Sequence, residues 1–331
     1  MATLKDVARL ANVDVSTVSR ALNNTSYVHP ETKERIYAAA KELGYRPNVI
    51  ARALRQGRSH VIGVVLPRLH LTIFSEILQG IEDEAQKHGY MTTVCVTEDD
   101  HKLERDRLAR LRDSGVDGII IAATGRNGRI LRDIRATGVP VVQLVRRQEQ
   151  GLSSVIADYE ACGYDAVKYL YEKGCRSIGL IAGAQHLMPY RGRYEGYKKA
   201  VAELGLEEIT GSCEREVNSF GYGYDSANLL LDDNPELDAI IAAVDVQGLG
   251  AIRAAAERGL AIPERLRIMS LTGHRVGRML ETTMTSMEMP AFDMGASAAQ
   301  LIIDFLEADP KFKPSERNTS FSSTLVERET T

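Results

Sequence analysis

Residues 3–23 read TLKDVARLANVDVSTVSRALN, a stretch that predicts two short helices joined by a tight turn. Thr3 can cap the first helix, and Asp6 completes an acidic version of the capping box three residues later. Asp14 is a suitable N-cap for a second helix from about Val15 to Asn23. This is the helix-turn-helix arrangement, in which the second helix enters the major groove and its first residues meet the base edges.

A third helix and a short hinge segment follow. Pro30 suits the first position of the third helix, and Gly44 supplies its C-terminal stop. Residues 48–57 then read NVIARALRQG, with Asn48 as a cap and Gly57 as a stop. A segment of this length is too short to be a stable helix alone. We therefore expect the hinge to fold only against a partner copy and DNA.

Charge is distributed unevenly along the chain. Residues 1–60 hold ten basic and five acidic side chains, a net charge of +5. Because the whole chain has a net charge of −4, the remaining residues carry a net charge of −9. A basic head on an acidic body fits contact with DNA phosphates by the head alone. The alternative is a generic three-helix segment with a solvated basic face, because helix-turn-helix patterns have false positives.

Beyond residue 60, apolar strand segments alternate with helical patterns. This alternation predicts two α/β lobes with doubly wound parallel sheets that face each other across a cleft. Ligands of such open sheets bind beyond the C-terminal ends of the strands. The predicted strands are 61–66, 91–96, 118–122, 140–145, 178–182, 239–244 and 266–271, and the predicted helices are 74–88, 101–114, 127–137, 158–173, 190–204, 220–231 and 246–259.

Several classes of protein are disfavoured by the rest of the sequence. The longest apolar runs are far below a membrane span, and the N-terminus is a charged, capped helix rather than a signal peptide. Four scattered cysteines without metal spacing suit reduced thiols in a cytoplasmic protein. The sequence has no phosphate-cradling glycine loop, nucleophile elbow or pair of metal-binding histidines. We expect no enzyme activity, no metal and no cofactor.

The motifs resemble the lactose/galactose repressor (LacI/GalR) family of bacterial transcriptional regulators over essentially the whole chain. The resemblance implies a helix-turn-helix domain over 1–46, a hinge helix and linker over 47–60, and a periplasmic-binding-protein-like effector and dimerisation domain over 61–331. It places lobe 1 at about 61–147 and 285–312 and lobe 2 at about 153–272 and 323–331, with crossings near 147–153, 272–284 and 312–323. The motifs are Leu4–Ala8, Val15–Arg20, Gly44–Asn48, Ile62–Val65, Val116–Ile120, Gly138–Val142 and Leu325–Thr331.

The resemblance also implies which residues of the head contact DNA. Leu54 falls at the hinge leucine that wedges into the minor groove and kinks the central base step. The alternative for Leu54 is an exposed hinge residue or one packed on the body. The base-reading positions are Val15, Ser16 and Arg20; the phosphate-contacting positions are Thr3, Thr17, Ser19, Asn23 and Asn48; and Ala51 accompanies Leu54 in the hinge.

The strand-end rule and the resemblance together place an effector site in the cleft. Arg191 falls where relatives clamp sugar hydroxyls or carboxylates, and Asp245 falls where they accept hydrogen bonds from sugar hydroxyls. The alternative for Arg191 and Arg193 is an ion pair at the cleft rim. The predicted effector residues are Arg68, His70, Thr72, Thr124, Arg146, Tyr190, Arg191, Arg193, Asp245 and Thr272.

Two departures from the family pattern bear on the ligand. Val244 stands where members usually have Asn, and Ser270-Leu271-Thr272 stands where they often have Gly-Phe-Asp or Gly-Tyr-Asp. The second lobe therefore lacks polar groups that relatives use. Five arginines assigned to the cleft suit an anionic ligand such as a sugar acid or a phosphate, because guanidinium forks match those oxygens. They are Arg68, Arg126, Arg146, Arg147 and Arg191.

These observations predict a cytoplasmic, homodimeric repressor of carbohydrate uptake or catabolism genes. Its partners would be double-stranded operator DNA, a small-molecule effector and a second copy of the chain, without a membrane. A first alternative is a global catabolite regulator whose corepressor is a phosphorylated carrier protein, since Val155–Glu160 and Arg275 resemble that subgroup. A second alternative, a solute-binding module of transport, is opposed by the basic head.

Overall fold

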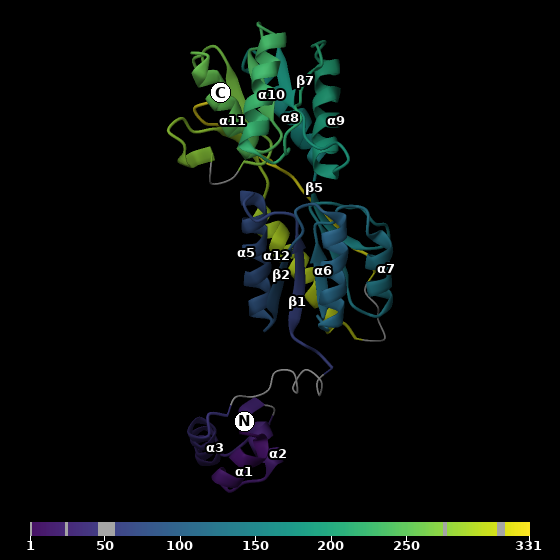
Figure 1. Ribbon diagram of the computed structural model, residues 1–331, viewed down its shortest axis with the longest axis vertical. Coiled ribbons are helices and arrows are strands. Elements are labelled where there is room, and N and C mark those ends of the chain that lie inside the picture. Colours follow the sequence, from purple (N-terminus) through teal and green to yellow (C-terminus); the bar gives the residue numbers. More distant parts are fainter. Residues whose placement is uncertain (1, 24–25, 46–56, 274–276, 310–314) are drawn as a thin grey trace. The chain divides into compact units, whose positions relative to one another are not determined.

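The computed structural model describes residues 2–23, 26–45, 57–273, 277–309 and 315–331. They form two compact units, Met1–Ser59 (the head) and His60–Thr331 (the body), each described here by itself (Figure 1). Within these residues, none of the helices has the length and apolar character needed to cross a bilayer. The predictions made for the hinge helix lie outside the described residues, as do those for Arg275 and the side chain of Asn23.

The head contains the three predicted helices: α1 (Leu4–Ala11), α2 (Val15–Asn23) and α3 (Pro30–Glu42). Their apolar faces meet in a small core in which Val7, Val18 and Ile36 are fully buried. The capping box at the start of α1 is confirmed, with the Thr3 amide donating to the Asp6 carboxylate at 2.9 Å. The turn after α1 places Asn12 in the left-handed region with a φ of 50°, a conformation that asparagine tolerates better than most residues.

The first lobe of the body is a six-stranded sheet in which all hydrogen-bonded neighbours run parallel. Helices α5 (Thr72–Lys87) and α12 (Ala291–Glu307) pack against each other on this lobe (Figure 1). The lobe also carries α6 (His101–Asp113) and α7 (Gly128–Ala136). The strand order is β11 (Asn318–Phe321), β5 (Ser153–Ala157), β4 (Val141–Leu144), β3 (Gly118–Ile121), β1 (Val61–Leu66) and β2 (Met91–Val96).

The second lobe repeats this plan, except that its last strand is antiparallel to its neighbour. Helices α8 (Tyr159–Glu172) and α9 (Met188–Glu203) approach closely, since a Cβ on Gly163 would collide with the Arg193 carbonyl. The remaining helices are α10 (Phe220–Asp233), α11 (Asp245–Glu257) and the 3₁₀ turn Gly277–Met279. The strand order is β12 (Thr324–Val326), β10 (Thr285–Glu288), β9 (Arg267–Ser270), β8 (Ala239–Ala242), β6 (Ile178–Ile181) and β7 (Ile209–Gly211).

Strand pairing places two of the three crossings between the lobes later in the chain than predicted. Strand β5 pairs with β4, so the chain leaves the first lobe after Ala157 rather than near 147–153. Strand β10 pairs with β9 and belongs to the second lobe, so the return follows Glu288 rather than 272–284. Strand β11 pairs with β5, so the last crossing lies between Phe321 and Thr324, at the end of the predicted range 312–323. At the first two crossings the chain therefore adds one more strand to its sheet than expected before it changes lobe.

Candidate functional site

The second helix of the head presents a polar face built by its N-terminal turn. The Ser16 amide donates to the Asp14 carboxylate at 2.7 Å, so Asp14 holds the start of α2 as expected. The buried side of α2 faces α1 and α3, while Val15 and Ser16 are exposed at its start. This exposed first turn is the part of a recognition helix that reaches base edges.

Arg20 lies on the same exposed side of α2, one turn further along. Its Nη2 donates to the Thr17 hydroxyl at 3.0 Å, and its Nε donates to the Ser16 carbonyl at 3.4 Å. These contacts orient a long side chain along the helix face that carries the other predicted base-reading residues. The Thr3 hydroxyl, expected to contact phosphate, donates to the Asp6 carboxylate at 2.7 Å and so takes part in the cap of α1.

The body contains two adjoining cavities between its lobes. Four residues line both cavities: Leu71 and Ile73 from the first lobe, and Val244 and Thr272 from the second. The first cavity also contains Asp245, whereas the second also contains Arg193. Both cavities therefore lie where the C-terminal strand ends of the two sheets face each other, as the strand-end rule predicts.

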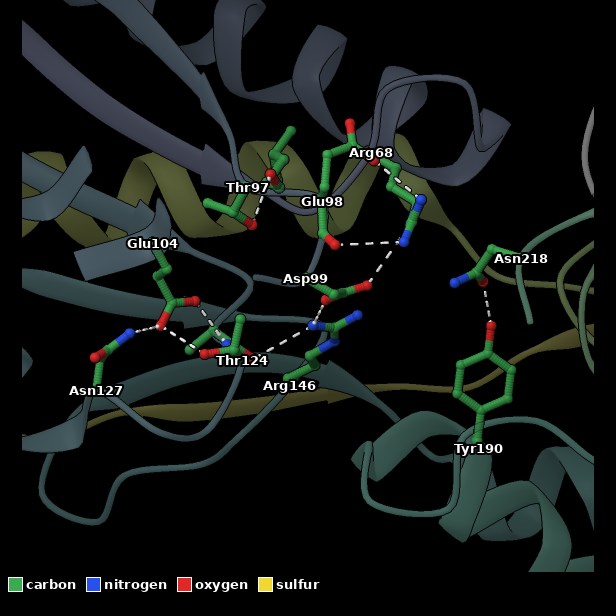
Figure 2. Close-up of polar contacts among 12 residues, drawn as sticks. Arg68, Thr97, Glu98, Asp99, Glu104, Thr124, Asn127, Arg146, Tyr190 and Asn218 are labelled. Carbon is green, nitrogen blue, oxygen red and sulfur yellow. Dashed lines mark hydrogen bonds and ion pairs between the residues drawn. The ribbon is translucent and has the colours of Figure 1, made fainter. Parts of the chain in front are cut away.

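Two of the predicted cleft arginines are neutralised by carboxylates of the loop after β2 (Figure 2). Arg146, which is buried, places Nη1 2.5 Å from Asp99 Oδ1. Arg68 places Nη1 3.0 Å from Glu98 Oε2, and its Nη2 lies 3.3 Å from Glu216 Oε1 in the second lobe. The ion pairs that were considered as an alternative for Arg191 and Arg193 are therefore formed by Arg68 and Arg146 instead.

Arg193 has a different environment. It is 2% exposed, and no carboxylate in the described part of the chain lies within ion-pair distance of it. Its guanidinium carbon lies 5.2 Å from the centre of the Tyr159 ring, and its Nη2 lies 3.7 Å from the Met289 sulfur. Its Nε is buried without a hydrogen-bond partner, as are those of Arg68 and Arg146, so the difference lies in the missing carboxylate. An unpaired buried guanidinium is costly, which makes this side chain a candidate ligand-binding group.

Asp245 is the corresponding acceptor in the first cavity. One carboxylate oxygen, Oδ1, accepts hydrogen bonds from Ser270 Oγ at 2.6 Å and from Thr272 Oγ1 at 3.3 Å. The other oxygen, Oδ2, is buried without a partner. The two hydroxyls at the end of β9, where relatives often carry other residues, therefore hold Asp245 in place and leave one oxygen available.

The backbone at the end of β4 is strained where it meets the cleft. Val145 adopts a φ of 64°, which is unusual for a β-branched residue, and the Arg146 amide donates to the Leu144 carbonyl across it at 2.6 Å. The Tyr159 hydroxyl donates to the Val145 carbonyl at 2.7 Å. Burial raises the pKa of Tyr159 to about 12, so this phenol stays protonated and keeps its role as donor. Strain of this kind is concentrated at functional sites.

Seven of the ten predicted effector residues line one of the two cavities, and three do not. Thr124 lines neither cavity; its hydroxyl donates instead to the buried Glu104 carboxylate at 2.8 Å, beside Asn127 (Figure 2). Arg191 is exposed and lines neither cavity. Arg68 lies outside both linings but holds Glu98 and Glu216. The cavity-lining members are His70, Thr72, Arg146, Tyr190, Arg193, Asp245 and Thr272.

Several cleft residues were missed from sequence. Asp99 lies in the loop after β2, and the strand-end rule would have selected it had it been applied to that strand. Asn218 accepts a hydrogen bond from the Tyr190 hydroxyl (Figure 2) and follows the short strand β7, which was not predicted. Tyr159 and Met289 sit at lobe crossings, where the predicted boundaries were displaced.

Comparison with known proteins identifies both units. A family model described as "Bacterial regulatory proteins, lacI family" matches residues 3–48. One described as "Periplasmic binding proteins and sugar binding domain of LacI family" matches residues 59–329. The ribose operon repressor of Halalkalibacterium halodurans is 33% identical over 310 residues, which cover 94% of this chain and 92% of that protein.

Two further relatives widen the comparison. Catabolite control protein A of Priestia megaterium is 29% identical over 309 residues, 93% of either chain. The crystal structure of the lac repressor dimer bound to operator and the anti-inducer ONPF matches with a TM-score of 0.87 at 25% identity. That match covers 99% of this chain and 98% of that one.

Proposed function

Because this chain belongs to the LacI family of bacterial regulatory proteins, we propose that it represses carbohydrate uptake or catabolism genes in the cytoplasm. The head reads duplex DNA, and a small molecule in the cleft controls that binding. The effector is a sugar, a sugar acid or a sugar phosphate. The similarity to a ribose operon repressor supports a sugar-related role.

The exposed first turn of α2 is the observation that carries the DNA-binding part of the proposal. Val15, Ser16 and Arg20 form one exposed set on a basic unit. We assign base contacts to these three residues. Thr3, Thr17, Ser19, Asn23 and Asn48 are assigned to phosphates, and Ala51 and Leu54 to the minor groove at the hinge.

Selection of duplexes from a random library by the full chain tests this assignment. Two heads of a symmetric dimer would enrich a pseudo-palindrome with two matching half-sites. Enrichment of no motif, at a salt concentration that suppresses non-specific phosphate binding, would argue against a sequence reader.

We propose a homodimer because a two-fold symmetric pair of heads would match a pseudo-palindromic site, and because the first sheet has an exposed apolar edge. Strand β2 is the edge strand of the first sheet, and it leaves Met91 72% exposed and Val94 36% exposed. An uncovered apolar edge is a liability that a partner copy would remove. Sedimentation equilibrium of the full chain should give twice the monomer mass; a monomer at micromolar concentration would contradict the proposal.

Effector and DNA are proposed to be linked through the lobes. Ligand in the cleft changes the angle between the lobes and so the spacing of the two hinges, with a coupling free energy of about 1–3 kcal/mol. Binding of the selected duplex measured with and without ligand would give its sign, which distinguishes induction from corepression.

The similarity to catabolite control protein A supports a second candidate function. In this alternative, the chain is a global catabolite regulator whose corepressor is a phosphorylated carrier protein. The segment that suggested it is largely interior: Val155, Ala157 and Tyr159 are each at most 3% exposed, and Asp158 caps α8. Such residues serve the core rather than a docking surface. Capture of a serine-phosphorylated carrier protein by the full chain, and not of its unphosphorylated form, would favour this candidate.

A further inference from the structure

The second cavity carries one cation that the protein leaves without a counter-ion. Arg193 is buried, and its contacts are uncharged groups: the Tyr159 ring, the Met289 sulfur and the Cys162 thiol. Its unpartnered Nε retains a hydrogen-bond donor inside the cavity wall. Because a desolvated charge without compensation is unfavourable, this position favours a ligand that brings a negative charge.

The neighbouring charges limit that ligand to a single negative charge. Arg146 is already paired with Asp99, and Arg68 is paired with Glu98 and Glu216. Asp99 also lines the second cavity, where it neutralises Arg146, so Arg193 supplies the one positive charge of this lining that has no carboxylate within ion-pair distance among the described residues. A phosphate monoester carries −1.5 to −2 charges near neutral pH, whereas a carboxylate carries one. The cavity therefore matches a carboxylate better than a phosphate.

The walls of the cavities further restrict the ligand. Nine apolar or aromatic side chains line the second cavity, among them Val145 and Val244. A hydroxyl placed against such a wall loses its hydrogen bonds to water without replacement. The adjoining cavity offers one unpartnered acceptor, Asp245 Oδ2. Thr272 lines both cavities and donates to the other oxygen of Asp245, which links the two ends of the cleft.

We infer that the effector is an organic monocarboxylate, with its carboxylate on Arg193 and a hydroxyl or other hydrogen-bond donor on Asp245. Its edge facing Val145 and Val244 carries no hydroxyl group. The five arginines considered from sequence do not include the residue that binds the anion. This inference rests on the proposed function, because it names the chemical class of the effector in the proposed site.

Matched pairs of small probes test the charge requirement in the full chain. Acetate and acetamide have the same shape and differ in charge, and benzoate and benzamide add an apolar body to the same pair. Thermal unfolding of the body is followed by calorimetry in each probe at constant ionic strength, with chloride and inorganic phosphate as reference anions. Arg193→Met removes the proposed anchor. Arg191→Met is its control, since Arg191 lies on the same helix but is exposed and lines neither cavity.

We expect acetate to raise the unfolding midpoint relative to chloride, and benzoate to raise it further, by about 2–4 °C. The two amides and phosphate should give no such shift. The shift should persist in Arg191→Met and disappear in Arg193→Met, with the circular dichroism spectrum of each variant confirming that it folds. If Arg193→Met does not fold, Arg193→Lys, which keeps the charge but loses the planar fork, should show a reduced shift.

The inference is overturned by equal shifts from the amides, by a larger shift from phosphate, by a shift that survives in Arg193→Met, or by no carboxylate shift in the wild-type chain. The outcome for DNA is read separately. A chain that selects a pseudo-palindrome but ignores carboxylates would refute only the effector class, whereas a chain that selects no motif would refute the proposed function.

Discussion

The head exposes the polar side chains assigned to DNA binding, whereas the body buries the polar side chains assigned to effector binding. In the head, Ser16 and Arg20 are exposed on α2, and the core beneath them is apolar. In the body, Arg193 and Asp245 are buried with unpartnered atoms, inside a cleft between two sheets. A DNA reader approaches a large, rigid polyanion from outside, so its polar groups must protrude. A sensor for a small molecule must surround it, so its polar groups are withheld from water until the ligand arrives.

The largest expected effect concerns the core that supports the head. Ile36 is fully buried in α3, and Ile36→Ala should cost about 2–5 kcal/mol of unfolding free energy through lost burial and a cavity. For so small a core this loss should unfold the head while the body keeps its own transition. Amide hydrogen exchange of the full chain, read separately for 4–42 and 61–309, measures both units at once.

Glu34→Ala is the control for that variant, because Glu34 is exposed on the same helix and surface substitutions change stability little. Loss of exchange protection throughout the body in Ile36→Ala would mean that the two units do not fold separately, and the comparison between them would have to be abandoned.

The next effect concerns DNA reading by an exposed side chain. Arg20→Ala should weaken binding to the selected duplex by about 1–3 kcal/mol and relax the preference at one base position. Arg9→Ala is the matched control, since Arg9 is exposed on α1 and pairs with Asp6. Fluorescence anisotropy with duplexes varied at each position provides the readout. An equal loss on every sequence would assign Arg20 to phosphate contact instead of base reading.

A smaller effect contrasts two residues held in the left-handed region. Asn12 in the head has a φ of 50°, and Val145 in the body has a φ of 64°. Positive φ is sterically unfavourable for a β-branched residue, whereas asparagine tolerates it. Asn12→Val should therefore lower the unfolding free energy of the head by about 1–2 kcal/mol. Asn12→Gly should be close to neutral, because glycine adopts positive φ freely. Urea unfolding of the full chain compares the two. Equal effects would show that backbone conformation is unimportant at this turn.

The smallest effect is the acid sensitivity of the head. Hydrogen bonds from Thr3 hold the pKa of Asp6 below its usual value, and hydrogen bonds from Ser16 do the same for Asp14. A depressed carboxyl pKa stabilises the fold above the unfolded pKa, and this stabilisation is lost as the pH falls through the folded value. The head should therefore lose stability below about pH 4. Helix content followed by circular dichroism should depend less on pH in Asp6→Asn and Asp14→Asn; an unchanged acid profile would contradict the capping roles.

The same contrast explains what could be predicted from the sequence. The bounds of α2 follow from local signals, namely Asp14 as a cap and a helical spacing of apolar residues, and the structure confirms them. The presence of two parallel α/β sheets also follows from local periodicity. The lobe to which β5 or β10 belongs does not follow from local periodicity, because a short strand such as Thr285–Glu288 contains no local signal of which sheet it joins.

The pairing of buried charges is still harder to predict from the sequence. Arg146 and Arg193 both belong to segments at strand or helix ends, yet one meets Asp99 and the other meets no carboxylate among the described residues. That difference depends on which loops meet across the cleft after the chain has crossed between lobes. Asp99 comes from the loop after β2 and Met289 from a crossing, and neither is near Arg193 in sequence.

The specificity of the full chain for DNA tests the central claim most directly. Equilibrium affinity should be measured for the selected duplex and for a scrambled duplex of equal length and composition, across a series of salt concentrations. We predict that the selected duplex binds about 10³-fold tighter or better, and that the logarithm of affinity falls linearly with the logarithm of salt concentration for both. Equal affinities for the two duplexes at every salt concentration would contradict sequence reading by the head.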